Sequence, residues 1–201
     1  AAGGDGDGFA IGTAHTIHSM RRNIDMTYVV MDNHVYGLTK GQASPRSDLG
    51  FQTVTSPEGT IENPISAIGL ALASGATFIA QTTARDIQGA AELIRQGMEH
   101  KGFAFINIFS PCVTYNPKNT YDWFAEHIKP LAEIEGYDPS NKMHALDALE
   151  KYDGLMTGVI YQDTTQKDYQ AKLTHSLATP LTELSLELDK DVFETWKKSY
   201  M

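Results

Sequence analysis

Short apolar segments alternate along this chain with longer segments of helical periodicity. Residues 26–31 (MTYVVM) form a continuous apolar run rich in β-branched residues, which is typical of a buried parallel strand, and 76–81 and 103–109 are similar runs. Residues 63–75 and 86–100 separate these runs and have the pattern of helices. This alternation predicts an α/β fold, in which a parallel sheet carries helices on both faces.

The expected helices have recognisable signals at their ends. Residues 9–23 place apolar side chains at helical spacing. A second helix is expected to begin at Asn63 as its N-cap, with Pro64 next, and to end at Gly75, since glycine readily adopts the conformation that terminates a helix. Asp86 is the expected N-cap of the third helix, because its carboxylate can accept the free backbone N–H groups of the first turn.

Composition excludes several classes of protein. The 201 residues carry a net charge of -9, which disfavours a nucleic-acid partner. No apolar run approaches the roughly 20 residues of a membrane span, and no signal-like stretch is present. A single cysteine, Cys112, rules out an internal disulfide framework and suggests a reducing compartment, so a cytoplasmic location is predicted.

The chain divides into two predicted parts. Residues 1–125 carry the alternating pattern and form an α/β domain, whereas 126–201 read as a helical and irregular extension that packs on this domain or on a partner subunit, ending in an amphipathic tail at 184–201. The opening glycines leave no room for a preceding strand, so the chain is expected to be incomplete at its N-terminus. Residues 37–64 predict a long loop, and a loop of that length is usually functional.

Residues 3–9 (GGDGDGF) concentrate glycines and carboxylates before an apolar run. The dinucleotide fingerprint G-x-G-x-x-G fails, because from Gly6 its last position is Ile11. An EF-hand loop counted from Asp5 lacks the required glycine and glutamate. A tight turn with aspartates facing solvent is the simplest remaining interpretation of this stretch alone.

A second polar segment, residues 31–42 (MDNHVYGLTKGQ), follows the strand predicted at 26–31. Loops that follow parallel strands meet at the carboxyl edge of the sheet, where α/β proteins bind ligands. Asp5 and Asn33 supply the oxygen ligands that Mg²⁺ prefers, and the helix after the glycines begins where a phosphate is favoured. The two segments therefore predict a site for a diphosphate with Mg²⁺.

These segments resemble those of a known family. Gly4-Asp5-Gly6, followed by a stretch that ends in Asn33, resembles the thiamine diphosphate motif. The variants GDGDGFAIG, DNHVYGLTKGQ and SPCVTYN resemble, more specifically, the β subunit of 2-oxoacid:ferredoxin oxidoreductases. The resemblance covers residues 1 to about 125 and continues more weakly to the end. It implies the thiamine diphosphate-binding fold for residues 1–125.

The resemblance also implies roles for individual residues. Asp5 and Asn33 would bind Mg²⁺ through their side chains and Val35 through its backbone carbonyl. Cys112 would be one ligand of a [4Fe–4S] cluster, whose other cysteines lie upstream in the family and are absent here. The residues implied to line the cofactor are Gly4, Asp5, Gly6, Asp7, Asn33, Tyr36, Gly37, Leu38 and Thr39.

The implied activity is the oxidative decarboxylation of a 2-oxoacid with coenzyme A, with electrons passing through the cluster to ferredoxin. The glutamate that activates the cofactor would belong to a partner α subunit, so no catalytic residue is assigned here and this chain alone is expected to be inactive. Pyruvate and 2-oxoglutarate both stay open as substrates.

Other interpretations remain at this stage. A non-oxidative thiamine diphosphate enzyme, such as a decarboxylase or an acetolactate synthase, would not need Cys112 as a cluster ligand. A non-catalytic module that binds Mg²⁺ and a nucleotide is a third possibility. In the loop, Lys40 or Arg46 could meet a substrate carboxylate, or either could be an ordinary solvated charge.

Overall fold

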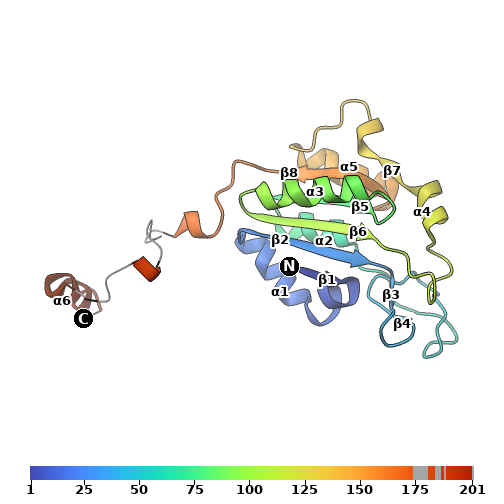
Figure 1. The fold of residues 1–201 in the computed structure, drawn as a ribbon, viewed down its shortest axis with the longest axis horizontal. Helices are drawn as coiled ribbons and strands as arrows, with labels where there is room; N and C mark the ends of the chain where they lie inside the picture. The colour runs from blue at the N-terminus through green and yellow to red at the C-terminus, as the bar shows by residue number, and fades with distance from the viewer. Residues whose placement is uncertain (174–180, 184–186, 188, 201) are drawn as a thin grey trace. The chain divides into compact units, whose positions relative to one another are not determined.

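In the computed structural model, the described residues are 1–173, 181–183, 187 and 189–200. Residues 1–170 form one compact unit and the residues from 171 onward belong to another (Figure 1). The strands are β1 (Ala2–Gly4), β2 (Met26–Asp32), β3 (Val35–Tyr36), β4 (Gln42–Ala43), β5 (Phe78–Thr83), β6 (Phe103–Phe109), β7 (Lys129–Pro130) and β8 (Met156–Gln162). The α-helices are α1 (Thr13–Arg22), α2 (Ala67–Ser74), α3 (Ile87–Glu99), α4 (Tyr121–His127), α5 (Lys142–Tyr152) and α6 (Lys190–Lys198).

The central sheet is mostly parallel, as predicted. Its strands follow the order β1-β2-β6-β5-β8-β7, and the pairs β1–β2, β2–β6 and β6–β5 are all parallel. Strand β8 joins β5 in the antiparallel direction, and β7 pairs with β8 in parallel. Strands β3 and β4 form a separate hairpin in the segment after β2.

Helices cover both faces of this sheet, and strand β6 shows why. Alternate side chains of a strand point to opposite faces. Phe103 and Phe105 lie in a core with side chains from α1, α2 and α5. Ala104, Ile106 and Ile108 lie in a second core with side chains from α3. Because every residue of β6 is buried, its sequence is a continuous apolar run with one polar interruption, Asn107.

Most of the predicted elements are confirmed, with shifts at their ends. Strand β6 matches its prediction, β2 extends one residue beyond 26–31, and β5 lies two residues later than 76–81. Helix α3 is capped as predicted, since the Asp86 carboxylate accepts a hydrogen bond of 2.9 Å from the backbone N–H of Gly89. Helix α2 ends at Gly75, whose φ of 82° is the left-handed conformation expected there.

The predicted start of α2 at Asn63 is wrong. The helix begins at Ala67, and the Ser66 hydroxyl is the N-cap that accepts from the backbone N–H of Gly69 at 3.1 Å. Ser66 itself has extended backbone dihedral angles, and the backbone N–H of Ile65 before it donates to the carbonyl of Pro45, at 2.8 Å. The segment before Ser66 is thus tied to the preceding loop.

The N-terminal segment also differs from expectation. Ala2–Gly4 themselves form strand β1, which pairs with Val29–Met31, so two of the opening glycines lie within a strand and not only in a turn. The predicted helix at 9–23 is interrupted: Asp7–Ile11 form a π-helical turn, in which the N–H of Gly12 donates to the carbonyl of Asp7 at 2.9 Å, and α1 follows. Glycine tolerates both an extended strand and a tight turn.

The C-terminal half differs more from the sequence prediction. Strand β8 is not among the predicted elements, and because it joins the central sheet, the compact unit extends to Gln170 rather than ending near residue 125. Within the predicted tail at 184–201, residues 184–186, 188 and 201 lie outside the described residues. The rest of it contains α6, an amphipathic helix whose Phe193 and Trp196 side chains are exposed. Among the described residues, none of the helices combines the length and apolar character needed to cross a bilayer.

A buried polar cluster joins elements at the amino edge of the sheet. The Thr77 hydroxyl donates to Asn23 Oδ1 at 2.7 Å, and His100 Nε2 lies 2.7 Å from the same hydroxyl oxygen. Because a hydroxyl has one proton to donate, His100 Nε2 is the donor in the second bond. Burial holds the pKa of His100 below its ordinary value of 6.5, against the opposing effect of the charges of Asp25 and Asp163.

His100 should therefore lower the free energy of unfolding in acid. A histidine whose folded pKa lies below its unfolded pKa stabilises the fold above that unfolded pKa and loses this contribution as pH falls below it. Urea unfolding at pH 7.5 and 5.5 is expected to show a smaller acid loss of the free energy of unfolding in His100→Gln than in wild type. The exposed His18 on α1 gives the control, His18→Gln, which should keep the wild-type acid loss. An unchanged acid loss in His100→Gln would contradict this.

Candidate cofactor and metal site

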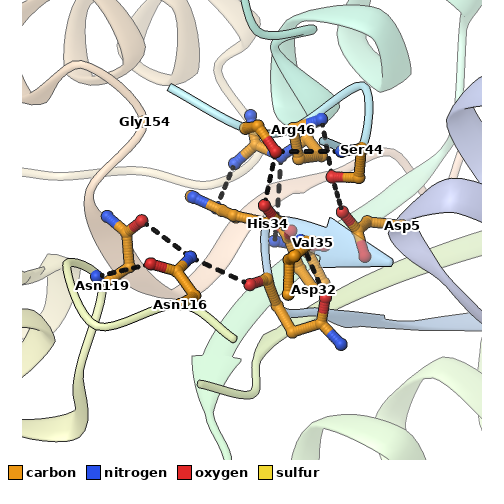
Figure 2. A network of polar contacts seen from close by, with 12 residues as sticks. Asp5, Asp32, His34, Val35, Ser44, Arg46, Asn116, Asn119 and Gly154 are labelled. Atoms are coloured by element: carbon orange, nitrogen blue, oxygen red, sulfur yellow. Dashed lines mark hydrogen bonds and ion pairs between the residues drawn. The ribbon is translucent and has the colours of Figure 1, made fainter. Parts of the chain in front are cut away.

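The predicted site residues follow neighbouring parallel strands. Asp5 follows β1, Asn33 follows β2 and Cys112 comes soon after β6, and the register pairs Gly4 with Met31 and Asp32 with Phe109. The three segments therefore leave the sheet at the same carboxyl edge, which is where α/β proteins bind ligands. Figure 2 shows the polar contacts that connect them.

Asp5 is a buried carboxylate at this edge, directly after the outermost strand β1. Its side chain is 2% exposed and accepts a hydrogen bond from the Ser44 hydroxyl. Burial, and then the nearby Asp32, raise the pKa of Asp5 to about 6, although the Ser44 hydroxyl, His34 and the backbone of Asn33 act in the opposite direction. A buried carboxylate with a raised pKa is unfavourable when ionised, so this residue fits a site at which a cation binds.

Asn33 and Val35 form a tight turn around His34. The Asn33 side-chain oxygen accepts from the backbone N–H of Val35 at 3.0 Å, and His34 has a φ of 60°, in the left-handed region. The Asn116 amide donates to the carbonyl of Asn33 at 3.2 Å, which ties the turn to the loop after β6. The turn is therefore held from two sides. A carbonyl oxygen has two lone pairs, so the Asn33 side chain can still accept a metal ion.

The glycines of the motif allow close approach between loops. A Cβ atom built on Gly6 would overlap the ring of Tyr36, although the backbone of Gly6 is ordinary right-handed helical. Glycine is therefore needed at Gly6 for space rather than for conformation. A Cβ atom on Gly37 would lie 3.8 Å from Cys112 Sγ, so the cysteine lies beside the second loop.

The remaining predicted residues are less closely gathered. Asp7 is exposed, and its carboxylate accepts from the backbone N–H of Gly4 at 2.8 Å. Thr39 contacts Gln42 through both its hydroxyl and its carbonyl oxygen. Leu38 is 98% exposed. These positions lie on the surface of the described chain and not in the buried part of the site.

Arg46 has a role that the sequence did not reveal. Its Nε donates to Asp32 at 2.9 Å and its Nη1 to the carbonyl of Ile65, while its Nη2 lies 3.3 Å from His34 Nε2. Arg46 is therefore neither an ordinary solvated charge nor free to meet a substrate carboxylate through these atoms. Only the folded chain brings its guanidinium to a carboxylate on β2.

Asp32 is completely buried beneath the loops. Burial by itself would raise its pKa, but the charges of the Arg46 guanidinium and of His34, whose Nε2 lies 3.4 Å away, and a hydrogen bond from Asn107 hold the pKa of Asp32 below its ordinary value. Asn107 also donates to Gln81 at 3.0 Å, so the carboxylate is connected to the middle of the sheet. Polar residues inside otherwise apolar strands are the signal that could have revealed this network from sequence.

The residues present fit some of the expected groups and not others. Asp5, Asn33 and the carbonyl of Val35 supply oxygen ligands of the kind that Mg²⁺ takes together with substrate phosphates. A [4Fe–4S] cluster is normally held by four thiolates, and the sequence has one cysteine. Among the described residues, no group of three or more His, Cys, Asp or Glu side chains is placed to hold a metal. Cys112 could therefore supply only one ligand of a cluster.

Two family models and several known proteins match this chain. Residues 1–108 match the family model described as "Thiamine pyrophosphate enzyme, C-terminal TPP binding domain", and residues 112–176 match the model of the C-terminal part of the pyruvate ferredoxin oxidoreductase β subunit. A 2-oxoacid:ferredoxin oxidoreductase β subunit of Saccharolobus solfataricus is 38% identical over 85% of this chain and 59% of its own length. The KorB subunit of a 2-oxoglutarate synthase of Methanocaldococcus jannaschii is 40% identical over 78% of this chain and 56% of its own.

A solved structure is similar as well. The 2-oxoglutarate:ferredoxin oxidoreductase from Magnetococcus marinus aligns with a TM-score of 0.79 and 42% identity, over 84% of this chain and 58% of that one. The chain thus spans less than two thirds of the relatives that it matches. The resemblance inferred from the motifs is confirmed: the chain belongs to the family of thiamine pyrophosphate enzymes, whose C-terminal TPP-binding domain it matches, and it is similar to the β subunits of 2-oxoacid:ferredoxin oxidoreductases.

Proposed function

We propose that this chain is the cofactor-binding part of a 2-oxoacid:ferredoxin oxidoreductase β subunit, which holds thiamine diphosphate through Mg²⁺. The observation that carries the proposal is the buried carboxylate of Asp5, 2% exposed and raised in pKa, at the sheet edge where the Asn33 turn also lies. The names of the similar proteins support the reaction, a coenzyme A-dependent oxidative decarboxylation of a 2-oxoacid with ferredoxin as electron acceptor.

The residues of this chain hold and orient the cofactor. Asp5 and Asn33 would hold Mg²⁺ through side-chain oxygens and Val35 through its carbonyl, as Mg²⁺ takes a few protein oxygens together with substrate phosphates. Gly4, Gly6 and Asp7 would contact the diphosphate, and Tyr36 to Thr39 would line the cofactor from the second loop. Thiamine diphosphate would supply the nucleophilic carbon for the 2-oxoacid, so the protein contributes binding and orientation.

The proposal assigns several partners. An α subunit supplies the glutamate that activates the cofactor, and ferredoxin, coenzyme A and the 2-oxoacid complete the reaction, in the cytoplasm. Pyruvate and 2-oxoglutarate are both candidate substrates. The similar structure was solved with 2-oxoglutarate, coenzyme A and succinyl-CoA bound, which favours 2-oxoglutarate.

Cys112 is proposed as one ligand of a [4Fe–4S] cluster whose other ligands lie outside this sequence. Its position beside Gly37 supports this proposal, because a cluster there would lie near the second cofactor loop. One thiolate does not by itself make a cluster site, so the remaining ligands must come from elsewhere in the complete enzyme.

The experiment that tests the proposal compares Cys112→Ala with wild type in the complete enzyme. Iron and sulfide per enzyme should fall and the EPR signal of the reduced cluster should be lost, because a ligand is removed, whereas thiamine diphosphate stays bound. Val113→Ala is the matched control, since this exposed neighbour lies in the same loop and should leave the iron content unchanged. Wild-type iron and EPR signal in Cys112→Ala would instead favour a non-oxidative thiamine diphosphate enzyme.

A further inference from the structure

The segment from Ser44 to Ser47 connects the two loops that carry the proposed metal ligands. At one end, the Ser44 hydroxyl donates to the Asp5 carboxylate in the first loop. At the other end, the Ser47 hydroxyl donates to the carbonyl of His34, between Asn33 and Val35, at 2.6 Å. The two serines contact each other through the backbone N–H of Ser44 and the Ser47 hydroxyl oxygen, at 2.9 Å. Figure 2 shows Ser44 between Arg46 and Asp5.

The direction of each hydroxyl proton follows from its other partner. The Ser44 oxygen accepts from the backbone N–H of Arg46 at 3.2 Å, which leaves its proton for Asp5. The Ser47 oxygen accepts from the backbone N–H of Ser44, which leaves its proton for His34. Each hydroxyl therefore uses both its donor and an acceptor function, and donation runs outward from Ser44, to Asp5 through its hydroxyl and toward His34 through its backbone N–H and the Ser47 hydroxyl.

This connection is buried and anchored. Ser44 is 7% exposed and Ser47 is 3% exposed, which is unusual for a loop of polar residues. Arg46, between them, is held by the carboxylate of Asp32 and the carbonyl of Ile65. The segment is thus fixed to strand β2 and to the residues before α2, and cannot move independently of either loop.

We propose that Ser44 and Ser47 are positioning residues that set the placement of Asp5 relative to the Asn33–Val35 turn, and thereby the geometry of the Mg²⁺ site. This inference rests on the proposed function. Residues that hold a metal ligand in place through hydrogen bonds commonly contribute a factor of about 10–100 to metal affinity. Mg²⁺ demands near-ideal octahedral geometry, whereas Ca²⁺ accepts flexible geometry, so a change in ligand placement weakens Mg²⁺ binding more than Ca²⁺ binding.

The test measures thiamine diphosphate binding by the complete enzyme, freed of cofactor, with either Mg²⁺ or Ca²⁺ as the metal. Isothermal titration calorimetry on Ser44→Ala should show a dissociation constant about 10-fold or more higher with Mg²⁺, in line with residues that support a ligand, and a smaller increase with Ca²⁺. Ser47→Ala should show the same preference, because it breaks the other end of the connection.

Thr60→Val is the matched control. The Thr60 hydroxyl donates to the carbonyl of Asp48 at 2.9 Å within the same long loop, so its hydrogen bond does not involve Asp5 or the Asn33–Val35 turn. Its loss should leave both dissociation constants near wild type. Melting temperatures without metal identify any variant that fails to fold. If Ser44→Ala fails to fold, the binding measured for Ser47→Ala tests the positioning role.

The outcomes separate this inference from the proposed function. If Asp5→Ala abolishes binding but Ser44→Ala and Ser47→Ala bind like wild type with both metals, the positioning role is wrong and the metal site stands. An equal loss with Mg²⁺ and Ca²⁺ would also overturn it, since general weakening of the loop would explain that result. If Asp5→Ala itself binds like wild type, the proposed function fails first.

Discussion

Asp5→Ala is expected to abolish the retention of thiamine diphosphate by the complete enzyme. The Mg²⁺ ion would lose its only charged protein ligand in the proposed set. Removing a residue that only supports a metal ligand lowers metal affinity by up to roughly 100-fold, and the loss in Asp5→Ala should be larger than that. Without metal, the variant should fold at least as well as wild type, because burial raises the pKa of Asp5 and makes its charge unfavourable in the folded state. Calorimetric titration and melting temperatures measure both effects.

Controls make this result specific. Asp147→Ala removes an exposed carboxylate from α5 and should leave cofactor binding unchanged. Titration with ATP and Mg²⁺ tests the alternative nucleotide-binding module, which the proposal expects not to bind. Wild-type retention of thiamine diphosphate in Asp5→Ala would refute the assignment of the motif.

Arg46→Met should destabilise the compact unit more than any exposed substitution. It leaves the carboxylate of Asp32, which is 0% exposed, without its cation, and removing one partner of a buried ion pair typically costs about 3–5 kcal/mol. Methionine keeps much of the side-chain volume, so lost packing contributes little. Urea unfolding of wild type and variant measures the difference in the free energy of unfolding.

A double variant and a surface control identify the cause. Arg46→Met with Asp32→Asn removes both charges, so it should cost less than the sum of the two single changes. Arg85→Met breaks the exposed ion pair with Asp122, at 3.3 Å, and should change stability by less than about 1 kcal/mol. If Arg46→Met lowers the free energy of unfolding no more than Arg85→Met does, the buried ion pair does not stabilise the loop.

The sequence by itself determined the fold class and the sheet edge at which the residues of the proposed site gather. Continuous apolar runs identified β2, β5 and β6, and in β5 and β6 nearly every residue is buried, which leaves no room for polar alternation. The caps at Asp86 and Gly75 were readable because they depend on neighbouring backbone groups alone. The glycine-rich turn and Asn33 could be assigned to one edge of the sheet, since parallel strands bring their carboxyl ends together.

Tertiary contacts decided the rest. The segment before α2 is tied to the carbonyl of Pro45 through Ile65, and β8 completes the sheet by pairing with β5 in the antiparallel direction. The ion pair of Arg46 with Asp32 joins a long loop to strand β2. The sequence alone presents Arg46 as a loop charge, whereas in the fold it is the partner of a buried carboxylate. Sequence patterns report contacts within a turn or a strand, whereas these arise between segments far apart in the chain, which only the folded protein brings together.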